Sequence, residues 1–341
     1  MMRTRDRGPL VSIVATTYAR ERVRDVEALI DSIAAQTYPC LELVFVAERV
    51  PEIAEQVAAY ARQRRFDTVR VLFHEGGGGL SRARNVGVDA ARGEIVAFID
   101  DDAVACPDWV ETIVTVLADH PSAIGVAGGA QPIWQDPSMR WFPEEFFWII
   151  SCPVPAWTGV KEVQPVRNAW GINMAFRREA FDRCRFSETF GVSNRGQPEG
   201  IKLGLQGDDT DFCVRVRRAT GRTILFAPSC QVYHKVSRDR LTPRFTRRQA
   251  FWDGYTKATI GSVLRETGDP ADRFALSNEF TALRQMVCSF FPSAAALLFR
   301  DPACAVRRLA LALDVLLHFG LGYIAARMPK PGQLLARRYA R

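Results

Sequence analysis

The segment Ile95-Val96-Ala97-Phe98-Ile99-Asp100-Asp101-Asp102 determines how the rest of the chain is interpreted. Its first five residues are apolar, which is typical of a strand buried on both faces of a sheet. Three carboxylates follow at the carboxyl end of that strand, where they repel one another unless a divalent cation offsets their charge. Such a cation would also bind phosphate oxygens. A solvated turn in which one aspartate caps the next helix is the simpler alternative.

Strand and helix patterns alternate on both sides of this segment. We expect strands at 11–15, 41–46, 69–73, 95–99 and 124–127, and helices at 25–36, 51–65, 81–91 and 109–117. The helical segments carry apolar residues at the spacing of one helix face. This alternation predicts an α/β fold with a doubly wound, mostly parallel sheet flanked by helices. Ligands of such sheets bind at the carboxyl ends of the strands.

The alternation ends near residue 131. Residues 131–166 are rich in Trp, Phe and Pro, and ordered elements are expected again at 169–176, 210–218 and 223–226. After about residue 280 the chain forms a different, helical unit with apolar runs at 286–299 and 309–326.

A second acidic cluster, Gly207-Asp208-Asp209-Thr210-Asp211, precedes an expected helix. A carboxylate at this place could act as a general base. It could instead cap the helix and interact favourably with the helix dipole.

Two further features could contribute to the same site. His234 follows an expected strand, where it could bind a metal, although a lone histidine is more often structural. The glycine run 76–79 leads into Ser81-Arg82-Ala83-Arg84-Asn85, and a helix start with two arginines favours an anion. Neither a P-loop nor a dinucleotide fingerprint is present in the sequence.

Charge and cysteine content limit the class of protein. The formal net charge is +7, and arginine supplies most of the positive charge, which reflects either coding bias or attraction to phosphates and anionic membranes. Nucleic-acid binding is not expected, because no basic stripe alternates with aromatic residues. The eight cysteines form no C-x-x-C pair, and the first residues hold no signal-peptide core, so we expect the catalytic part to face the cytoplasm.

These motifs, in this order, resemble the inverting family-2 glycosyltransferases of the GT-A fold. The matching segments are residues 11–20, 80–87, 98–102, 207–212 and 228–234. Segments 141–148, 167–168 and 240–257 resemble a subset of the family that builds lipid-linked or surface glycans. The resemblance implies a GT-A domain over residues 1–240, with a nucleotide-sugar half at about 9–130 and an acceptor half at about 131–240. A C-terminal helical region, 241–341, would follow.

The resemblance also implies residue roles in a hexosyltransferase reaction. Asp209, with Asp208 as a rival, would be the catalytic base, and Mn²⁺ or Mg²⁺ would bind Asp100, Asp102 and His234. The donor, a nucleotide sugar for which UDP is the expected carrier, would contact Thr17, Tyr18, Arg20, Glu48, Arg84, Asn85, Asp100 and Asp101. The acceptor would be a hydroxyl of a glycan or a lipid-linked saccharide. The aromatic residues of segment 134–157 could stack on sugars, contact lipid or pack a core.

The sequence departs from the family pattern at three places. Ala19 stands where the family usually has Asn, and Glu48 is the acid at the end of the second strand where a pair is usual. The base segment reads Gly-Asp-Asp instead of Gly-Glu-Asp. The shorter first side chain is why Asp209 is preferred as the base.

The C-terminal region raises the question of membrane attachment. Residues 309–326 are just long enough to span a bilayer, but Asp314 and His318 lie within them, and a buried Asp is costly in lipid. We therefore expect an interfacial or hairpin attachment at the cytoplasmic face, peripheral or monotopic, aided by Arg307, Arg308, Arg327 and the basic tail. A soluble cytoplasmic protein with a packed helical C-terminus is the alternative.

Other functions fit parts of the sequence. Residues 100–104 match the D-x-D-x-[TV] form of haloacid-dehalogenase-type phosphohydrolases, in which Asp100 would attack phosphorus and Asp102 would transfer the proton. That motif normally ends the first strand of its domain, and here three strand-helix units precede it. A non-catalytic nucleotide-sugar-binding protein would not need the second acidic cluster. Nucleotidyl transfer would need a glycine- and lysine-bearing loop after the first strand, which residues 16–20 do not provide.

Overall fold

The structure, a computed structural model, describes residues 8–64, 66, 68–75, 79–153, 161–188, 207–266, 284 and 286–328. The chain divides into two compact units. The sheet unit comprises residues 1–132, 160–196 and 208–235, and the helical unit comprises 133–159, 197–207 and 236–341. The described residues 133–153, which we expected in the acceptor half of the domain, therefore cluster with the C-terminal helices. Glycines 76–78, Trp157 and the basic tail 330–341 lie outside the described residues.

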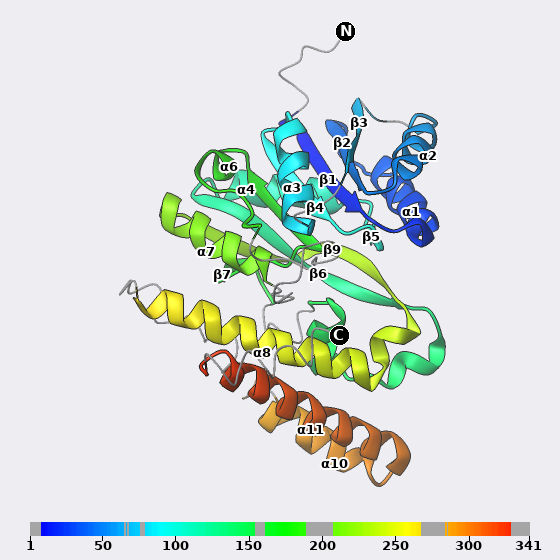
Figure 1. Cartoon of the computed structure of the whole chain (residues 1–341), viewed down its shortest axis with the longest axis vertical. Coiled ribbons are helices and arrows are strands. Elements are labelled where there is room, and N and C mark those ends of the chain that lie inside the picture. The colour runs from blue at the N-terminus through cyan, green and yellow to red at the C-terminus, as the bar shows by residue number, and fades with distance from the viewer. Residues whose placement is uncertain are drawn as a thin grey trace. The chain divides into compact units, whose positions relative to one another are not determined.

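The first half of the sheet is parallel, as the β-α alternation predicts (Figure 1). Its strands are β1 (Val11–Thr17), β2 (Leu41–Glu48), β3 (Thr68–His74) and β4 (Ile95–Ile99), which lie in the order β3-β2-β1-β4. The carboxyl ends of these strands therefore meet at one edge of the sheet.

The second half of the sheet is antiparallel. It contains β5 (Ala103–Ala105), β6 (Ala123–Trp134), β7 (Gln164–Val166), β8 (Asn173–Arg177) and β9 (Thr223–Val236). Strand β8 lies between β4 and β6 and is antiparallel to both, while β5 and β7 pair with β9. The strand at 123–134 therefore does not continue the parallel pattern, and the sheet is mixed.

Helices cover both faces of the sheet. They are α1 (Val23–Ala34), α2 (Pro51–Ala61), α3 (Gly79–Ala90), α4 (Trp109–Asp119), α6 (Glu179–Arg183) and α7 (Asp208–Thr220), with a short 3-10 helix η1 (Arg20–Arg22) after β1. Neighbouring residues of β1 enter different cores: Ile13 packs in the cluster with α1, α2 and α4, and Val14 in the cluster with α3, α6 and α7. This period of two buries the sheet on both sides.

Two adjacent glycines of β6 differ sharply in the space around them. A Cβ at Gly128 would lie 1.9 Å from the backbone oxygen of Cys230, whereas one at Gly129 would meet only the side chain of Gln231, at 2.6 Å. We expect Gly128→Ala to lower the free energy of unfolding by about 1–3 kcal/mol, because the neighbouring strand must move. Gly129→Ala should have a clearly smaller effect. Denaturant unfolding of the two variants checks this, and equal losses would contradict it.

The helical unit contains η2 (Pro137–Trp141), η3 (Glu144–Ile150), η4 (Arg238–Leu241), α8 (Pro243–Glu266), the π-helical turn η6 (Met286–Phe290), α10 (Phe291–Leu297) and α11 (Pro302–Ala325). Helices α8 and α11 lie side by side (Figure 1). The described aromatic residues of segment 134–148 pack among themselves and with residues of α8, η6 and α11. Of the three roles expected for this segment, core packing is the one that these contacts show.

Candidate active site

The three aspartates after β4 have different surroundings. Asp101 and Asp102 are buried, whereas Asp100 is partly exposed. Thr17, at the end of β1, donates a hydrogen bond from Oγ1 to Asp101 Oδ2 at 2.6 Å. Arg22 of η1 donates to Asp101 and, over 3.2 Å, to Asp102 Oδ2. Burial raises the pKa of Asp101 to about 6, against the opposing effect of Arg22.

Asp102 lies beside His234 because β5 pairs with β9. The register places Ala103 opposite His234, and the backbone N–H of Lys235 donates to the carbonyl of Asp102 at 2.9 Å. His234 Nε2 and Asp102 Oδ1 are then 3.1 Å apart, with both side chains buried. An imidazole nitrogen and a carboxylate oxygen at this separation can share one divalent cation.

This donor set fits a cation that is only partly held by the protein. Within the described ranges, no group of three His, Cys, Asp or Glu side chains is close enough to hold a metal. Asp102 and His234 are a pair that could supply two ligands. Such a set suits Mg²⁺ or Mn²⁺, for which phosphate oxygens and water commonly complete the shell. Asp100 is directed to Arg84 in this structure.

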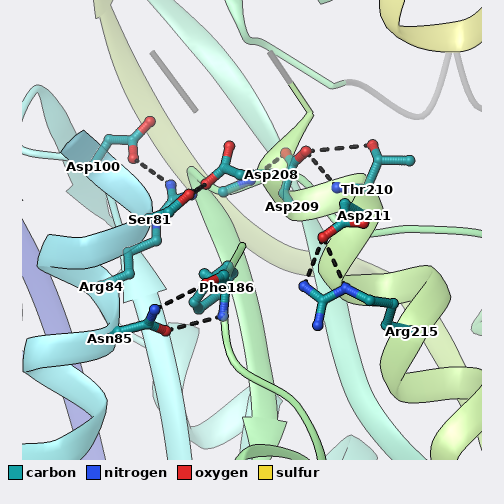
Figure 2. Close-up of polar contacts among 11 residues, drawn as sticks. Ser81, Arg84, Asn85, Asp100, Phe186, Asp208, Asp209, Thr210, Asp211 and Arg215 are labelled. Carbon is teal, nitrogen blue, oxygen red and sulfur yellow. Dashed lines mark hydrogen bonds and ion pairs between the residues drawn. The ribbon is translucent and has the colours of Figure 1, made fainter. Parts of the chain in front are cut away.

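Arg84 of α3 joins the two acidic clusters (Figure 2). Its Nη1 donates to Asp208 Oδ2 at 2.7 Å, and its Nη2 lies 3.4 Å from Asp100 Oδ1. The guanidinium is buried, and burial alone would lower its pKa, but Asp208 and Asp100 outweigh this and raise it. A Cβ at Gly171 would lie 2.1 Å from Arg84 Nη2, so a larger residue here would displace the guanidinium from this position.

Asp209 is the second residue of α7 and lies beside Asp208 at the start of that helix (Figure 2). It is partly buried and accepts hydrogen bonds from the backbone N–H groups of Gly171 (3.0 Å) and Thr210 (2.6 Å). Burial and the negative charge of Asp208 raise the pKa of Asp209 to about 6, although Arg84 and the two N–H groups oppose this. A carboxylate with this pKa can accept a proton near neutral pH.

The other acid of this helix start is turned away. Asp211 accepts from Arg215, one turn further along α7, at 2.6 Å (Figure 2). Gly207 has a φ of 99°, a conformation that favours glycine, and α7 begins at the next residue with three acids in its first turn. The cluster therefore both starts the helix and supplies Asp208 and Asp209 to the site.

Known proteins match this fold and motif order. The sequence model of the family described as glycosyl transferase family 2 matches residues 12–185, which is half of the chain. The chain belongs to glycosyl transferase family 2.

Two relatives of this family-2 enzyme carry names from glycan synthesis. The glucosyl-dolichyl phosphate glucuronosyltransferase of Haloferax volcanii is 29% identical over 315 residues, which cover 92% of this chain and 95% of the relative. The succinoglycan biosynthesis protein ExoM of Rhizobium meliloti is 28% identical over 247 residues, or 71% of this chain and 69% of the relative.

Solved structures support the GT-A fold. The mannosyltransferase PcManGT of Pyrobaculum calidifontis, in complex with GDP-Man and Mn²⁺, aligns with a TM-score of 0.58 at 19% identity over 93% of this chain and 87% of its own. Residues 1–349 of S. aureus TarS align with a TM-score of 0.54 at 14% identity, over 97% of this chain and 88% of that chain.

Of the remaining residues expected to bind the donor, Tyr18 and Arg20 are exposed, whereas Asn85 bonds to the protein backbone. Tyr18 is 48% exposed, with the guanidinium of Arg22 5.8 Å from its ring. Arg20 is exposed and pairs with Glu52 at 2.9 Å. The amide of Asn85 bonds both backbone groups of Phe186, at 2.9 Å each, and so ties α3 to the segment after α6 (Figure 2).

Glu48 ends β2 at the same sheet edge as Asp100. It is buried, and burial raises its pKa. It lies opposite His74 in the β2–β3 register, and His74 Nε2 has no hydrogen-bond partner among the described residues. The next residue, Arg49, has a φ of 68°, which turns the chain away from the sheet.

Sequence reasoning missed two residues of the candidate site. Arg22, rather than Arg20, contacts the aspartate cluster, and Gly171 both makes room for Arg84 and donates to Asp209. Arg22 lies two residues after Arg20 in the same basic stretch. Only a correct prediction of the 3-10 turn η1 would have shown which of the two arginines faces the aspartates. Gly171 carried no such signal, because its role depends on contacts distant in sequence.

Proposed function

We propose that the protein is a metal-dependent, inverting glycosyltransferase that moves a sugar from a nucleoside-diphosphate donor to a hydroxyl of a lipid-linked glycan. Asp209 carries most of this proposal. It is a carboxylate with a pKa of about 6, and the Asp208–Arg84–Asp100 chain joins it to the aspartates that follow β4. Family membership supports the reaction class.

The donor would lie along the carboxyl ends of β1, β2 and β4. Glu48 would accept hydrogen bonds from the ribose or base, and Thr17, Tyr18 and Arg20 would line the same side. Asp100, Asp101, Arg84 and Asn85 would position the sugar and diphosphate, Asn85 through the segment that it ties to α3. UDP is the donor carrier that we propose. The neighbour solved with GDP-Man makes GDP the carrier to test beside it.

Asp102 and His234, with Asp100, would hold Mn²⁺ or Mg²⁺ against the diphosphate of the donor. Bound there, the cation stabilises negative charge on the leaving diphosphate. Arg22 contacts Asp101 and Asp102 and keeps both carboxylates oriented. The neighbouring mannosyltransferase with Mn²⁺ supports this choice of cation.

Asp209 would take the proton of the acceptor hydroxyl as that oxygen attacks the anomeric carbon. The two N–H groups that it accepts from fix its orientation. Asp208 is committed to Arg84 and is the weaker candidate for the base. Attack from the face opposite the diphosphate inverts the anomeric configuration in one displacement.

The relatives support a proposal for the acceptor and the location. The Haloferax relative is named for a dolichyl-phosphate-linked glucose acceptor, so a polyprenyl- or dolichyl-phosphate-linked saccharide is the acceptor class that we propose. With such an acceptor and a nucleotide-sugar donor, the enzyme would act at the cytoplasmic face of a membrane, as a peripheral or monotopic protein. No observation favours the phosphohydrolase or the non-catalytic binder considered above.

A donor panel tests this function. Purified protein is incubated with Mn²⁺, a lipid-linked saccharide and, in turn, UDP- and GDP-sugars including UDP-glucuronate. We expect release of nucleoside diphosphate from one donor, in step with a mass increase of the acceptor by one sugar. Hydrolysis of simple phosphate esters without sugar transfer would instead support the phosphohydrolase.

The activity should depend on pH through Asp209. Because burial and Asp208 raise the pKa of Asp209 to about 6, the base is protonated and inactive below that pH. We expect kcat/KM to fall about tenfold per pH unit below about pH 6 and to level off above it. The residual rate of Asp209→Asn should not show this decline. A wild-type profile that is flat from pH 5 to 7 would contradict the assignment.

A further inference from the structure

One face of α11 is fixed against α8. A Cβ at Gly322 would lie 1.9 Å from the backbone oxygen of Phe251, and one at Gly254 would lie 2.1 Å from that of Phe319. These approaches leave no room for side chains, so the two helix backbones are in contact. The buried residues Ala312, Val315 and Gly322 lie on this face of α11.

The opposite face of α11 presents a line of large apolar side chains, which we call the α11 stripe: Val306, Leu313, Leu317 and Ile324. They are 59%, 64%, 59% and 55% exposed. Spacings of seven, four and seven residues place all four on one side of a helix, over a length of about 27 Å. Phe299, 93% exposed, precedes the stripe and Met328 follows it. Exposed aliphatic residues in such a line indicate an interaction surface.

Basic and aromatic residues stand at both ends of the stripe. At the start of α11, the Arg307 guanidinium lies 3.8 Å from the ring centroid of Trp141, and Arg308 Nε donates to the backbone oxygen of Trp141 at 2.9 Å. At the end, Arg327 lies 4.3 Å from the ring centroid of Tyr323 and donates to its hydroxyl at 2.7 Å. Arginine beside Trp or Tyr is the combination found where a helix meets lipid headgroups. The sequence continues with Lys330, Arg337, Arg338 and Arg341.

Asp314, the acidic residue that would be costly in lipid, is paired with an arginine. Asp314 is the sole Asp or Glu in the α11 sequence, and both of its oxygens accept from Arg247 Nε of α8, at 2.9 and 2.8 Å. His318 lies on the same side of the helix, with Nδ1 3.5 Å from Asp314 Oδ1. The stripe can therefore face lipid without presenting an uncompensated carboxylate.

We propose that the α11 stripe binds the surface of an anionic bilayer, with α11 lying in the plane of the interface. This deepens the membrane location given under the proposed function. By length and composition, α11 is the described helix that could cross a membrane. Its contact with α8 along one face and the Arg247–Asp314 pair favour lying on the bilayer over spanning it. The charges favour an anionic bilayer over a second copy of the chain. Arginines flank the stripe at both ends, so an antiparallel pairing of two copies would place arginines near arginines.

Vesicle flotation of the full chain tests the proposal, with no donor or acceptor present. We expect the protein to float with phosphatidylcholine vesicles containing phosphatidylglycerol, and to bind vesicles of phosphatidylcholine alone at least tenfold more weakly. Leu313→Gln with Leu317→Gln should lower the partition coefficient at least tenfold. Arg307→Gln with Arg327→Gln should lower binding to anionic vesicles about fivefold per arginine.

Ile133→Gln with Val163→Gln is the matched control, because it removes two exposed aliphatic side chains outside the stripe, 40% and 37% exposed. It should bind vesicles like wild type. The thermal unfolding midpoint of each variant shows that the fold is kept. Transfer to a water-soluble acceptor should be unchanged in the leucine variant. Since binding is measured without substrates, failure of the proposed reaction would leave this result intact.

Three results would overturn the proposal. Leucine variants that float like wild type would show that the stripe does not bind lipid. Wild-type dimers that become monomers in the leucine variant, without vesicle binding, would make a second copy the occupant. Wild-type protein that alkaline carbonate does not release from membranes, while detergent does, would show that the helix spans the bilayer.

Discussion

Asp209→Asn is expected to lower kcat/KM by about 10²–10⁴-fold, with a much smaller loss of stability of about 1–3 kcal/mol from one broken hydrogen bond. Asparagine keeps the shape of the side chain, but its single oxygen can accept from only one of the two N–H groups, because Gly171 donates to Oδ2 and Thr210 to Oδ1. It cannot take the proton of an acceptor hydroxyl at any accessible pH. Steady-state kinetics with saturating donor measures the loss.

Two neighbours serve as controls for Asp209. Asp211→Asn makes the same change in the same helix turn, but Asp211 faces Arg215, so activity should stay within about threefold of wild type. Asp208→Ala leaves the buried Arg84 without its nearest partner and should destabilise the fold by about 3 kcal/mol or more. Near-normal turnover in Asp209→Asn, with activity lost in a folded Asp208 variant, would transfer the role of base to Asp208.

Asp102→Asn is expected to produce the second large effect, a rise of at least about 100-fold in the Mn²⁺ concentration needed for half-maximal activity. An amide is a much weaker ligand for a hard cation than a carboxylate, and only His234 would remain of the close pair. Titration of chelator-treated enzyme with Mn²⁺ or Mg²⁺ measures the change.

The matched control for Asp102 is Asp25→Asn. It removes an ion pair with Lys235, the neighbour of His234, without touching Asp102. Its metal requirement should equal that of wild type. Full activity of the wild-type enzyme in excess chelator would contradict the metal-dependent account.

The sequence predicted the parallel half of the fold because each β-α unit there is local. The strand at 95–99 is a continuous apolar run, and the strand at 41–48 is apolar apart from Glu42 and Glu48. The antiparallel half could not be predicted in this way. Insertion of β8 between β4 and β6 joins segments about 75 residues apart, and no local pattern encodes that pairing.

The same distinction applies to the site. The aspartates at 100–102 and 208–209 were identifiable because acids cluster at a strand end and a helix start. The contacts between them were not identifiable: Arg84 bonds Asp100 and also Asp208, 124 residues further along the chain than Arg84, and Gly171 lies against the same guanidinium. The choice of Arg22 over Arg20 depends on one 3-10 turn, and such boundaries are the least certain part of a sequence pattern.

The aromatic segment illustrates the competition between packing and function. Trp and Phe are suited both to stacking on sugars and to filling a core. In the helical unit, Phe142 and Phe147 stack on each other and Phe146 meets Phe290 edge to face. Burial, which is a property of the fold and not of the segment, decides this in favour of packing.

The anomeric configuration of the product tests the central claim most directly. With the donor identified by the panel, ¹H NMR of the newly formed glycosidic bond gives the configuration, and that of the donor is known. A single displacement with Asp209 as base predicts the opposite configuration in product and donor. Retention of the donor configuration, or release of free sugar without a new glycosidic bond, would contradict it.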